Sequence, residues 1–122
     1  MTKEINSLVL AYLGDTIYED YIREYLIKKG IASIKELQEA SMDYVSAKSQ
    51  ARILEELINK NIFNEEELEI IKRARNHKTI SHPRNCDIVT YKYATGFEAL
   101  IGYLKLEGKE ERINEIMKSI LV

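Results

Sequence analysis

The chain has 122 residues, of which 45% are hydrophobic and 31% charged, a balance that excludes a disordered or fibrous protein and fits one folded domain. Its formal net charge is -2, and its single cysteine, Cys86, excludes an internal disulfide and is typical of a reducing compartment. We see no secretory leader and no apolar run of the roughly 18 residues that a membrane span needs, so we expect a cytoplasmic protein.

The first half of the chain predicts three helices. Apolar residues recur at helical spacing from about residue 6 to residue 29, where Gly30 ends the first helix. Apolar side chains lie all around this helix, which predicts deep burial. Ser33 begins a capping-box sequence and opens a short second helix. We expect Ser41 to cap a third helix that runs to about Asn59.

The second half predicts three more helices. Asn64 starts the fourth, in which Leu68 is expected to face inward. The residues between 76 and 86 include both histidines and the only proline, and they predict a loop. Helices over about 87–106 and 109–121 follow. Because no segment alternates polar and apolar residues for long enough to form a convincing strand, the predicted fold class is all-α.

Basic residues are concentrated in one segment of this otherwise acidic chain. From residue 72 to residue 92 the only acid is Asp87, among the basic residues Lys72, Arg73, Arg75, Lys78, Arg84 and Lys92. Such a segment predicts a local surface that binds a polyanion. An exposed, solvated loop explains the charge equally well, and the helix dipole explains the cations that end the fourth helix.

Two predicted buried helices carry a glycine beside an acid, in Gly14-Asp15 and in Gly96-Phe-Glu98. A glycine inside a helix costs about 1 kcal/mol relative to alanine, so each one predicts the close approach of another backbone. That approach would bring the two acids together among apolar neighbours, where a hard cation such as magnesium would stabilise them. On spacing alone, pairing of each acid with a lysine or arginine, or its exposure to solvent, remains an alternative.

Four residues around the predicted loop have side chains suited to zinc, namely His77, His82, Cys86 and Asp87. Their spacing matches no compact zinc motif, and no second pair of ligands is available. Phosphate or ribose contacts suit the histidines better, and an ordinary loop position is the simplest explanation for all four.

The two acid-bearing segments together resemble the signature of a known family. Tyr12-Leu-Gly-Asp-Thr-Ile-Tyr-Glu19, followed by Gly96-Phe-Glu-Ala-Leu-Ile-Gly102, is similar to the catalytic domain of ribonuclease III, in the same order and at a suitable separation. Canonical members add a double-stranded-RNA-binding domain, for which this chain has no room, so the closer likeness is to the mini-ribonuclease III branch. The resemblance covers nearly the whole chain and implies one ribonuclease III-like helical endonuclease domain over residues 1–122.

The resemblance implies a magnesium-dependent endoribonuclease that cleaves double-stranded RNA and leaves 5′-phosphate ends. Asp15 and Glu98 match the catalytic and metal-binding positions. The larger family has two further acids, at positions where this chain has Ala11 and Thr95. Helical spacing places Ala11 on the face of Asp15 and Thr95 on that of Glu98, so two direct protein ligands remain and the number of metal ions is open.

Water, the RNA phosphate and the Thr95 hydroxyl are the expected further groups around the metal. Glu19, one helical turn beyond Asp15, is a candidate for ordering outer-shell water, although a solvated position explains it more simply.

The resemblance also implies a homodimer and a ribosomal RNA substrate, a precursor of the large-subunit (23S) RNA. Without a separate RNA-binding domain, this domain has to hold the duplex itself. Its expected phosphate contacts are Arg73, Arg75, Lys78 and Arg84, with Lys48 and Gln50 as weaker candidates. Lys48 is equally well explained as a surface lysine, and Gln50 as a structural amide.

Two other functions remain open on the sequence. A non-catalytic helical domain that binds duplex RNA would keep the basic surface, with Ala11 and Thr95 marking a degenerate metal site. A helical protein-interaction adaptor would not bind RNA at all. Cleavage that is lost in Asp15→Asn excludes the first function, and salt-sensitive binding to duplex RNA excludes the second.

Overall fold

The computed structural model describes residues 2–78 and 86–121, and all regular structure in these two ranges is helical. The predicted all-α class is therefore confirmed. A short 3-10 helix precedes the α-helices, and the elements are η1 (Thr2–Glu4), α1 (Ser7–Lys28), α2 (Ile34–Val45), α3 (Ala47–Asn59), α4 (Glu65–Arg75), α5 (Ile88–Leu106) and α6 (Glu110–Ile120). Within the same ranges, no helix is both long and apolar enough to cross a membrane.

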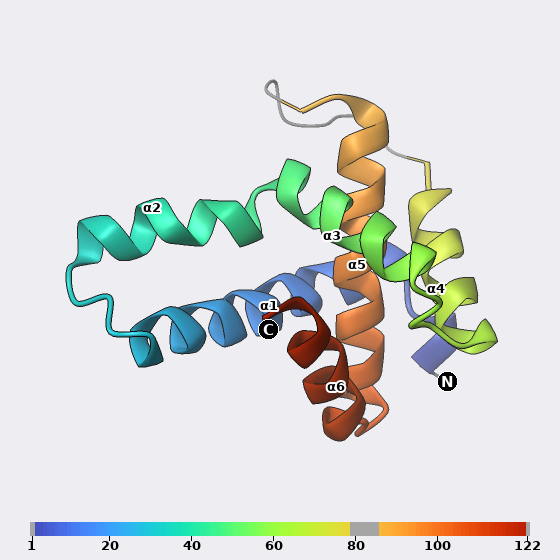
Figure 1. Cartoon of the computed structure of the whole chain (residues 1–122). Helices are drawn as coiled ribbons and strands as arrows, with labels where there is room; N and C mark the ends of the chain where they lie inside the picture. The colour runs from blue at the N-terminus through green and yellow to red at the C-terminus, as the bar shows by residue number, and fades with distance from the viewer. Residues whose placement is uncertain (1, 79–85, 122) are drawn as a thin grey trace.

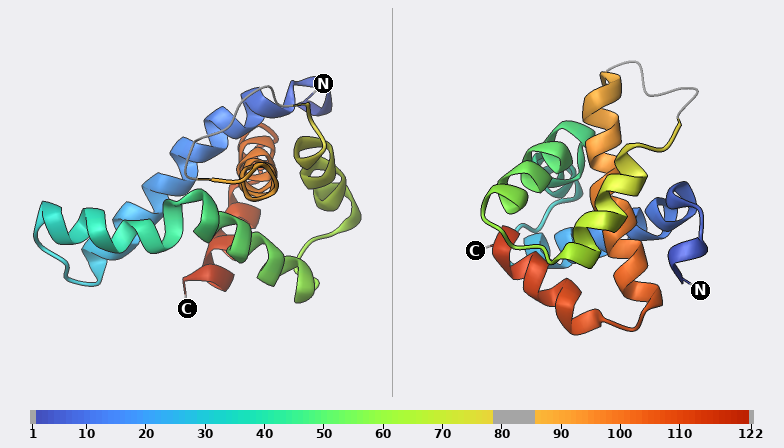
Figure 2. Two further views of the ribbon diagram at one scale, coloured as in Figure 1. Left: turned by 90° about the horizontal axis from the view of Figure 1, so that it is seen from above. Right: turned by 90° about the vertical axis from the view of Figure 1, so that its right-hand side faces the viewer.

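Helix α5 stands at the centre of the molecule, and the other helices are arranged around it (Figure 1). Its contact with α1 is the most extensive between any two elements, and α3 and α4 also pack against it. Seen from above, α1 passes across one side of α5 while α4 lies beside it (Figure 2). Helix α2 runs alongside the C-terminal half of α1, and the two project from the core as an arm (Figure 1).

The core is built mainly from the facing sides of α1 and α5. Tyr18 and Phe97 are fully buried, and their rings meet edge to face with centroids 5.1 Å apart. The buried Tyr18 hydroxyl donates a hydrogen bond to the Tyr44 carbonyl oxygen at 2.8 Å. This bond fastens the end of α2 to α1, so it fixes the position where the chain turns from α2 into α3.

The helix boundaries follow the local signals with one exception. The N-caps Asn6, Ser33, Asn64 and Asp87 each accept a backbone hydrogen bond from the first turn of their helix. Gly30 adopts a positive φ of 97° just after α1, as a helix-ending glycine does. These residues fix the ends of α1 and the starts of α2, α4 and α5.

Ser41 is the exception, because it does not start a helix. Helix α2 runs through it to Val45, and the Ser41 hydroxyl donates instead to the Gln38 carbonyl oxygen at 2.9 Å. The break falls at Ser46, which has an extended backbone and accepts a hydrogen bond from the Ser49 N–H at 3.1 Å. Tyr44 and Val45 pack against the core, and this packing favours continuing α2 beyond Ser41.

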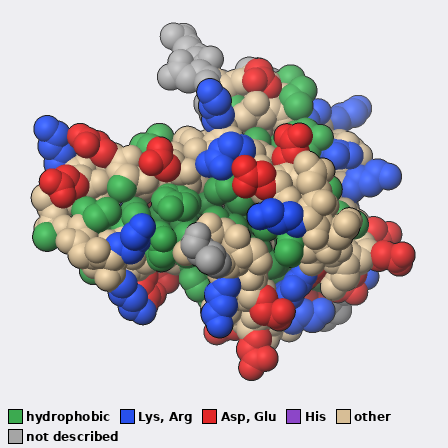
Figure 3. All heavy atoms as spheres, in the orientation of Figure 1, with side chains coloured by type: hydrophobic (Ala, Val, Ile, Leu, Met, Phe, Trp, Pro, Cys, Tyr) green, Lys and Arg blue, Asp and Glu red, His purple; other side chains and the backbone are tan. Residues whose placement is uncertain are grey.

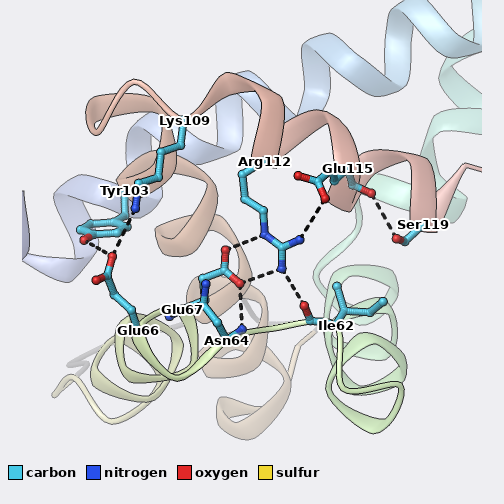
Figure 4. A network of polar contacts seen from close by, with 9 residues as sticks. All are labelled: Ile62, Asn64, Glu66, Glu67, Tyr103, Lys109, Arg112, Glu115 and Ser119. Atoms are coloured by element: carbon cyan, nitrogen blue, oxygen red, sulfur yellow. Dashed lines mark hydrogen bonds and ion pairs between the residues drawn. The ribbon is translucent and has the colours of Figure 1, made fainter.

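The inward face of α4 also differs from the prediction. Leu68 is exposed, whereas Glu67 is only 3% exposed and lies in the buried row with Ile70 and Ile71. Arg112 of α6 neutralises it, donating from Nε to Oε2 at 2.7 Å and from Nη2 to Oε1 at 2.8 Å (Figure 4). Helix α4 can therefore bury an acid in place of a leucine.

Candidate active site

Helices α1 and α5 touch each other directly through their backbones. A Cβ atom added to Gly14 of α1 would lie 1.7 Å from the Glu98 carbonyl oxygen, and one added to Gly102 of α5 would lie 2.0 Å from the Leu10 carbonyl oxygen. Neither position has room for any side chain, since real Cβ atoms do not approach backbone atoms so closely. The close approach predicted at Gly14 is present.

Gly96 does not take part in this crossing, although the sequence predicted the close approach of another backbone there as well. It faces α4, where an added Cβ would lie 3.2 Å from the Ile71 carbonyl oxygen. The glycine opposite Gly14 is Gly102, one helical turn after Glu98 and on the same side of α5. This spacing of four residues between an acid and a glycine is the sequence signal that would have identified it.

The crossing brings Asp15 and Glu98 together, so that their carboxyl groups lie within hydrogen-bonding reach. Glu98 is largely buried, and burial raises its pKa to about 9, with further contributions from the hydrogen bond and the charge of Asp15. Asp15 itself is exposed, because the outer side of α1 is open at this point. The expectation that both acids are desolvated is therefore correct for Glu98 and wrong for Asp15.

Gln50, at the start of α3, is the third polar residue of the site. It is only 2% exposed, and its Nε2 donates to the Val45 carbonyl oxygen at 3.1 Å and to Glu98 Oε2 at 3.5 Å. Its hydrogen bonds oppose the other effects on Glu98 by lowering the pKa. Because Gln50 is buried, the geometry favours the structural amide over the phosphate contact that was also suggested for it.

Thr95 and Glu19, the two candidates for further groups around the metal, already make polar contacts within the protein. Thr95 is buried, and its hydroxyl donates to the Tyr91 carbonyl oxygen at 2.9 Å, one turn back in the same helix. The Glu19 carboxylate pairs with Arg23 at 3.5 Å, and its charge contributes to the raised pKa of Glu98. Glu19 thus lies near enough to the acids to act on them electrostatically, and Thr95 keeps only the acceptor capacity of its hydroxyl.

The donor set of this site fits a hard cation. Asp15 and Glu98 offer carboxylate oxygens, and no lysine or arginine pairs with either acid among the ion pairs of the described residues. Mg²⁺ prefers such oxygen ligands, keeps several waters and is commonly held by one or two carboxylates. Within residues 2–78 and 86–121, no cluster of three or more histidines, cysteines and acids is placed to hold a metal.

The described part of the predicted loop gives no support to a zinc centre. His77 Nδ1 lies 2.8 Å from the Lys78 carbonyl oxygen, and the Cys86 thiol donates to the Asp87 carbonyl oxygen. Burial raises the pKa of Cys86, and the Asp87 charge adds to this effect. His82 lies outside the described residues.

The basic residues predicted to bind RNA differ in their contacts with the rest of the protein. Arg73 donates to Ser7 Oγ at 3.2 Å, to the Ile5 carbonyl oxygen at 3.0 Å and to that of Lys3, so it fastens the N-terminal segment to α4. This structural role accounts for Arg73 without RNA. The Arg75 guanidinium stacks over an aromatic ring of α5, Lys48 and Lys78 are exposed, and Arg84 lies outside the described residues.

Known proteins share both the sequence and the fold of this chain. Residues 8–109 match a family model described as the ribonuclease III domain. Relatives named Mini-ribonuclease 3 from Brevibacillus brevis and Enterococcus faecalis are 51% and 44% identical, over 93% and 94% of this chain and 83% and 87% of their own lengths. A crystal structure of a Fusobacterium nucleatum protein is similar, with a TM-score of 0.86 and 38% identity over 96% of this chain and 93% of that one.

Proposed function

The chain belongs to the ribonuclease III domain family and is an endoribonuclease, and from this premise we propose that it cleaves double-stranded RNA with Mg²⁺ held by Asp15 and Glu98. The observation that carries the proposal is the pair of facing carboxyl groups at the α1–α5 crossing. One of them, Glu98, is largely buried and has no basic partner among the described residues, a costly arrangement for a protein that does not bind a cation there.

The two acids have different roles in such a site. Glu98 is fixed on the central helix and largely buried, so it provides a ligand in a constant position. Asp15 is exposed, so it provides a ligand on the side from which a phosphate group enters. A bound Mg²⁺ supplies a water of lowered pKa and positive charge beside the scissile phosphate. The proposed products carry 5′-phosphate and 3′-hydroxyl ends.

The RNA duplex is held by basic side chains that remain available. Lys48 is exposed on α3, two residues before Gln50, and Lys78 is exposed after α4. Together with Arg75 and Arg84, these residues are the proposed phosphate contacts, which recognise duplex shape rather than sequence. For the natural substrate we propose a precursor of large-subunit (23S) ribosomal RNA in the cytoplasm, as the resemblance to the mini-ribonuclease III branch implies. The names of the relatives support a ribonuclease.

A homodimer is the proposed assembly, and the outer side of α1 supports it. Tyr12 is 82% exposed and Val9 55% exposed, and both lie within two turns of Asp15. Hydrophobic side chains also gather where α1, α2 and α3 meet, on the face shown in Figure 3. Exposed apolar surface of this kind marks a protein interface, and a second copy would place two active centres on one duplex.

Replacing Tyr12 by arginine tests the homodimer. We expect Tyr12→Arg to convert a dimer into a monomer in sedimentation equilibrium, because a charged side chain would have to be buried at the interface. Lys28→Arg, at an exposed position near the end of α1, is the control and should leave the dimer intact. A monomeric wild-type protein would contradict the proposed assembly.

Asp15→Asn is the test of the proposed chemistry. We expect cleavage of a structured RNA fragment to fall by at least about 10³-fold, since a catalytic ligand is lost, while duplex binding is retained. Asp20→Asn, an equivalent change at an exposed position of α1, should leave cleavage unchanged. Undiminished cleavage by Asp15→Asn, or cleavage in excess chelator, would refute the role of the two acids. Duplex binding without cleavage by the wild type would favour the non-catalytic alternative.

A further inference from the structure

Gln50 contacts one of the proposed ligands yet has no role in the chemistry described so far. The residue is almost completely buried at the point where α2 ends, α3 begins and α5 passes. A glutamine at such a position carries two polar atoms, Oε1 and Nε2, into the core, where a leucine or methionine of similar volume would pack without that cost. Its retention beside Glu98 therefore needs an explanation.

The orientation of the Gln50 amide is fixed by its neighbours. Nε2 lies 3.1 Å from the carbonyl oxygen of Val45, the last residue of α2, so this end of the amide must be the donor. The same nitrogen lies 3.5 Å from Glu98 Oε2. Val45 is held in turn by the neighbouring Tyr44 carbonyl, which accepts from Tyr18. Hydrogen bonds thus connect Glu98, through Gln50, to the turn between α2 and α3.

The other end of the amide has no partner. Gln50 Oε1 is buried, and among the described residues no group donates a hydrogen bond to it. An unsatisfied buried acceptor is destabilising, and in native proteins such atoms commonly mark a site for a water, an ion or a ligand. Here the free oxygen belongs to the same planar amide group whose nitrogen faces Glu98.

We propose that Gln50 is a positioning residue for the cation: its Nε2 holds the Glu98 carboxylate toward Asp15, and its Oε1 accepts a hydrogen bond from the hydrated ion. This role rests on the proposed function, because it requires a cation between the two acids. It also accounts for a site with only two carboxylates. A neutral amide adds an oxygen acceptor without adding another negative charge beside Glu98, which already has Asp15 and Glu19 nearby.

Gln50→Met tests this role, since it keeps the length of the side chain and removes both polar ends. We expect Mn²⁺, measured by electron paramagnetic resonance as a substitute for Mg²⁺, to bind about 10- to 100-fold more weakly. We also expect kcat to fall by a similar factor while KM for duplex RNA is unchanged. Gln38→Met, the same change at an exposed glutamine of α2, is the control and should alter neither quantity. A folded Gln50→Met protein with wild-type Mn²⁺ affinity would overturn the inference.

A second measurement needs no substitution at Gln50 and covers the case in which that variant does not fold. The side-chain amide signal of Gln50 in a ¹⁵N–¹H spectrum of the wild type should shift when Mg²⁺ is added, and it should not shift in Asp15→Asn. An unchanged Gln50 signal in wild-type protein that binds Mg²⁺ contradicts the positioning role alone. Wild-type protein that binds neither Mg²⁺ nor Mn²⁺ overturns the proposed function as well.

Discussion

Two regions of this protein bury a glutamate, and they do so under opposite conditions. At the α4–α6 contact, Glu67 accepts hydrogen bonds from Arg112 and from the Asn64 N–H (Figure 4). Burial alone would raise its pKa, but these hydrogen bonds outweigh burial and lower it. At the α1–α5 crossing, Glu98 faces another acid, and its pKa is raised to about 9.

The difference separates an acid that the fold neutralises from the acid that we propose to bind a cation. The Glu67 region has its positive charge built in, so it stabilises the fold and leaves nothing for a ligand to supply. Among the described residues no such charge pairs with Glu98, and its region has one side open at the exposed Asp15. The contrast is therefore the basis on which we propose a functional role for Glu98 and a structural one for Glu67.

The largest expected effect is on the crossing that places Glu98. We expect Gly102→Ala to destabilise the protein by more than about 3 kcal/mol, above the usual cost of overpacking, because the new Cβ would lie 2.0 Å from a backbone oxygen that cannot move alone. Gly96→Ala is the matched control in the same helix, where the nearest atom would be 3.2 Å away, and it should cost no more than about 1 kcal/mol. Urea denaturation of both variants measures the contrast, and similar losses would show that the two helices are not in backbone contact.

The next effect concerns the neutralised acid. We expect Arg112→Leu to cost about 3 kcal/mol at pH 7, because it leaves the Glu67 carboxylate buried without its partner. Since the folded-state pKa of Glu67 is lowered, the pair stabilises the wild type above the ordinary value of 4.5, and this contribution is lost as pH falls through the lowered pKa. The difference between the two proteins should therefore shrink in acid. A difference that is constant from pH 7 to pH 3 would mean that Arg112 acts only by packing.

The smallest effect has the opposite sign and concerns Glu98 itself. Because the folded-state pKa of this carboxyl is raised from 4.5 to about 9, its ionisation destabilises the cation-free fold progressively as pH rises between these values. We expect Glu98→Gln to stabilise the protein in chelator by about 1–3 kcal/mol at pH 7 and by nothing at pH 4. Thermal unfolding at the two pH values measures this. Glu67→Gln should lower stability at pH 7. If both substitutions changed stability in the same direction, the two regions would not differ as we describe.

Most of the helical architecture could be predicted from local sequence signals. The caps at Asn6, Ser33 and Asn64 and the glycine at position 30 act within one or two turns, so they leave a readable pattern. The prediction at Ser41 was wrong because the hydroxyl of a serine inside a helix can also form a hydrogen bond with the backbone of the same helix, here with the Gln38 carbonyl oxygen. The packing of Tyr44 and Val45 against the core, which continues the helix, is a tertiary effect.

The geometry of the candidate site could be predicted in part, for a related reason. The sequence predicted that Asp15 and Glu98 come together, but which glycine lies opposite Gly14 depends on how two helices distant in sequence cross. The place of Arg73 depends on where the N-terminal segment folds back, which no pattern within α4 shows. The burial of Gln50 likewise follows from its position between three helices.

The contact between Gly14 and Gly102 has one more consequence. Where side chains separate two helices, every change of a core residue alters their spacing, but here main-chain atoms set the distance and are the same in any sequence that keeps both glycines. Substitutions elsewhere in the core should therefore have little effect on the distance between the two carboxyl groups. Exchanges among the surrounding Leu, Ile and Phe side chains, for example, should leave the proposed pair of ligands in place.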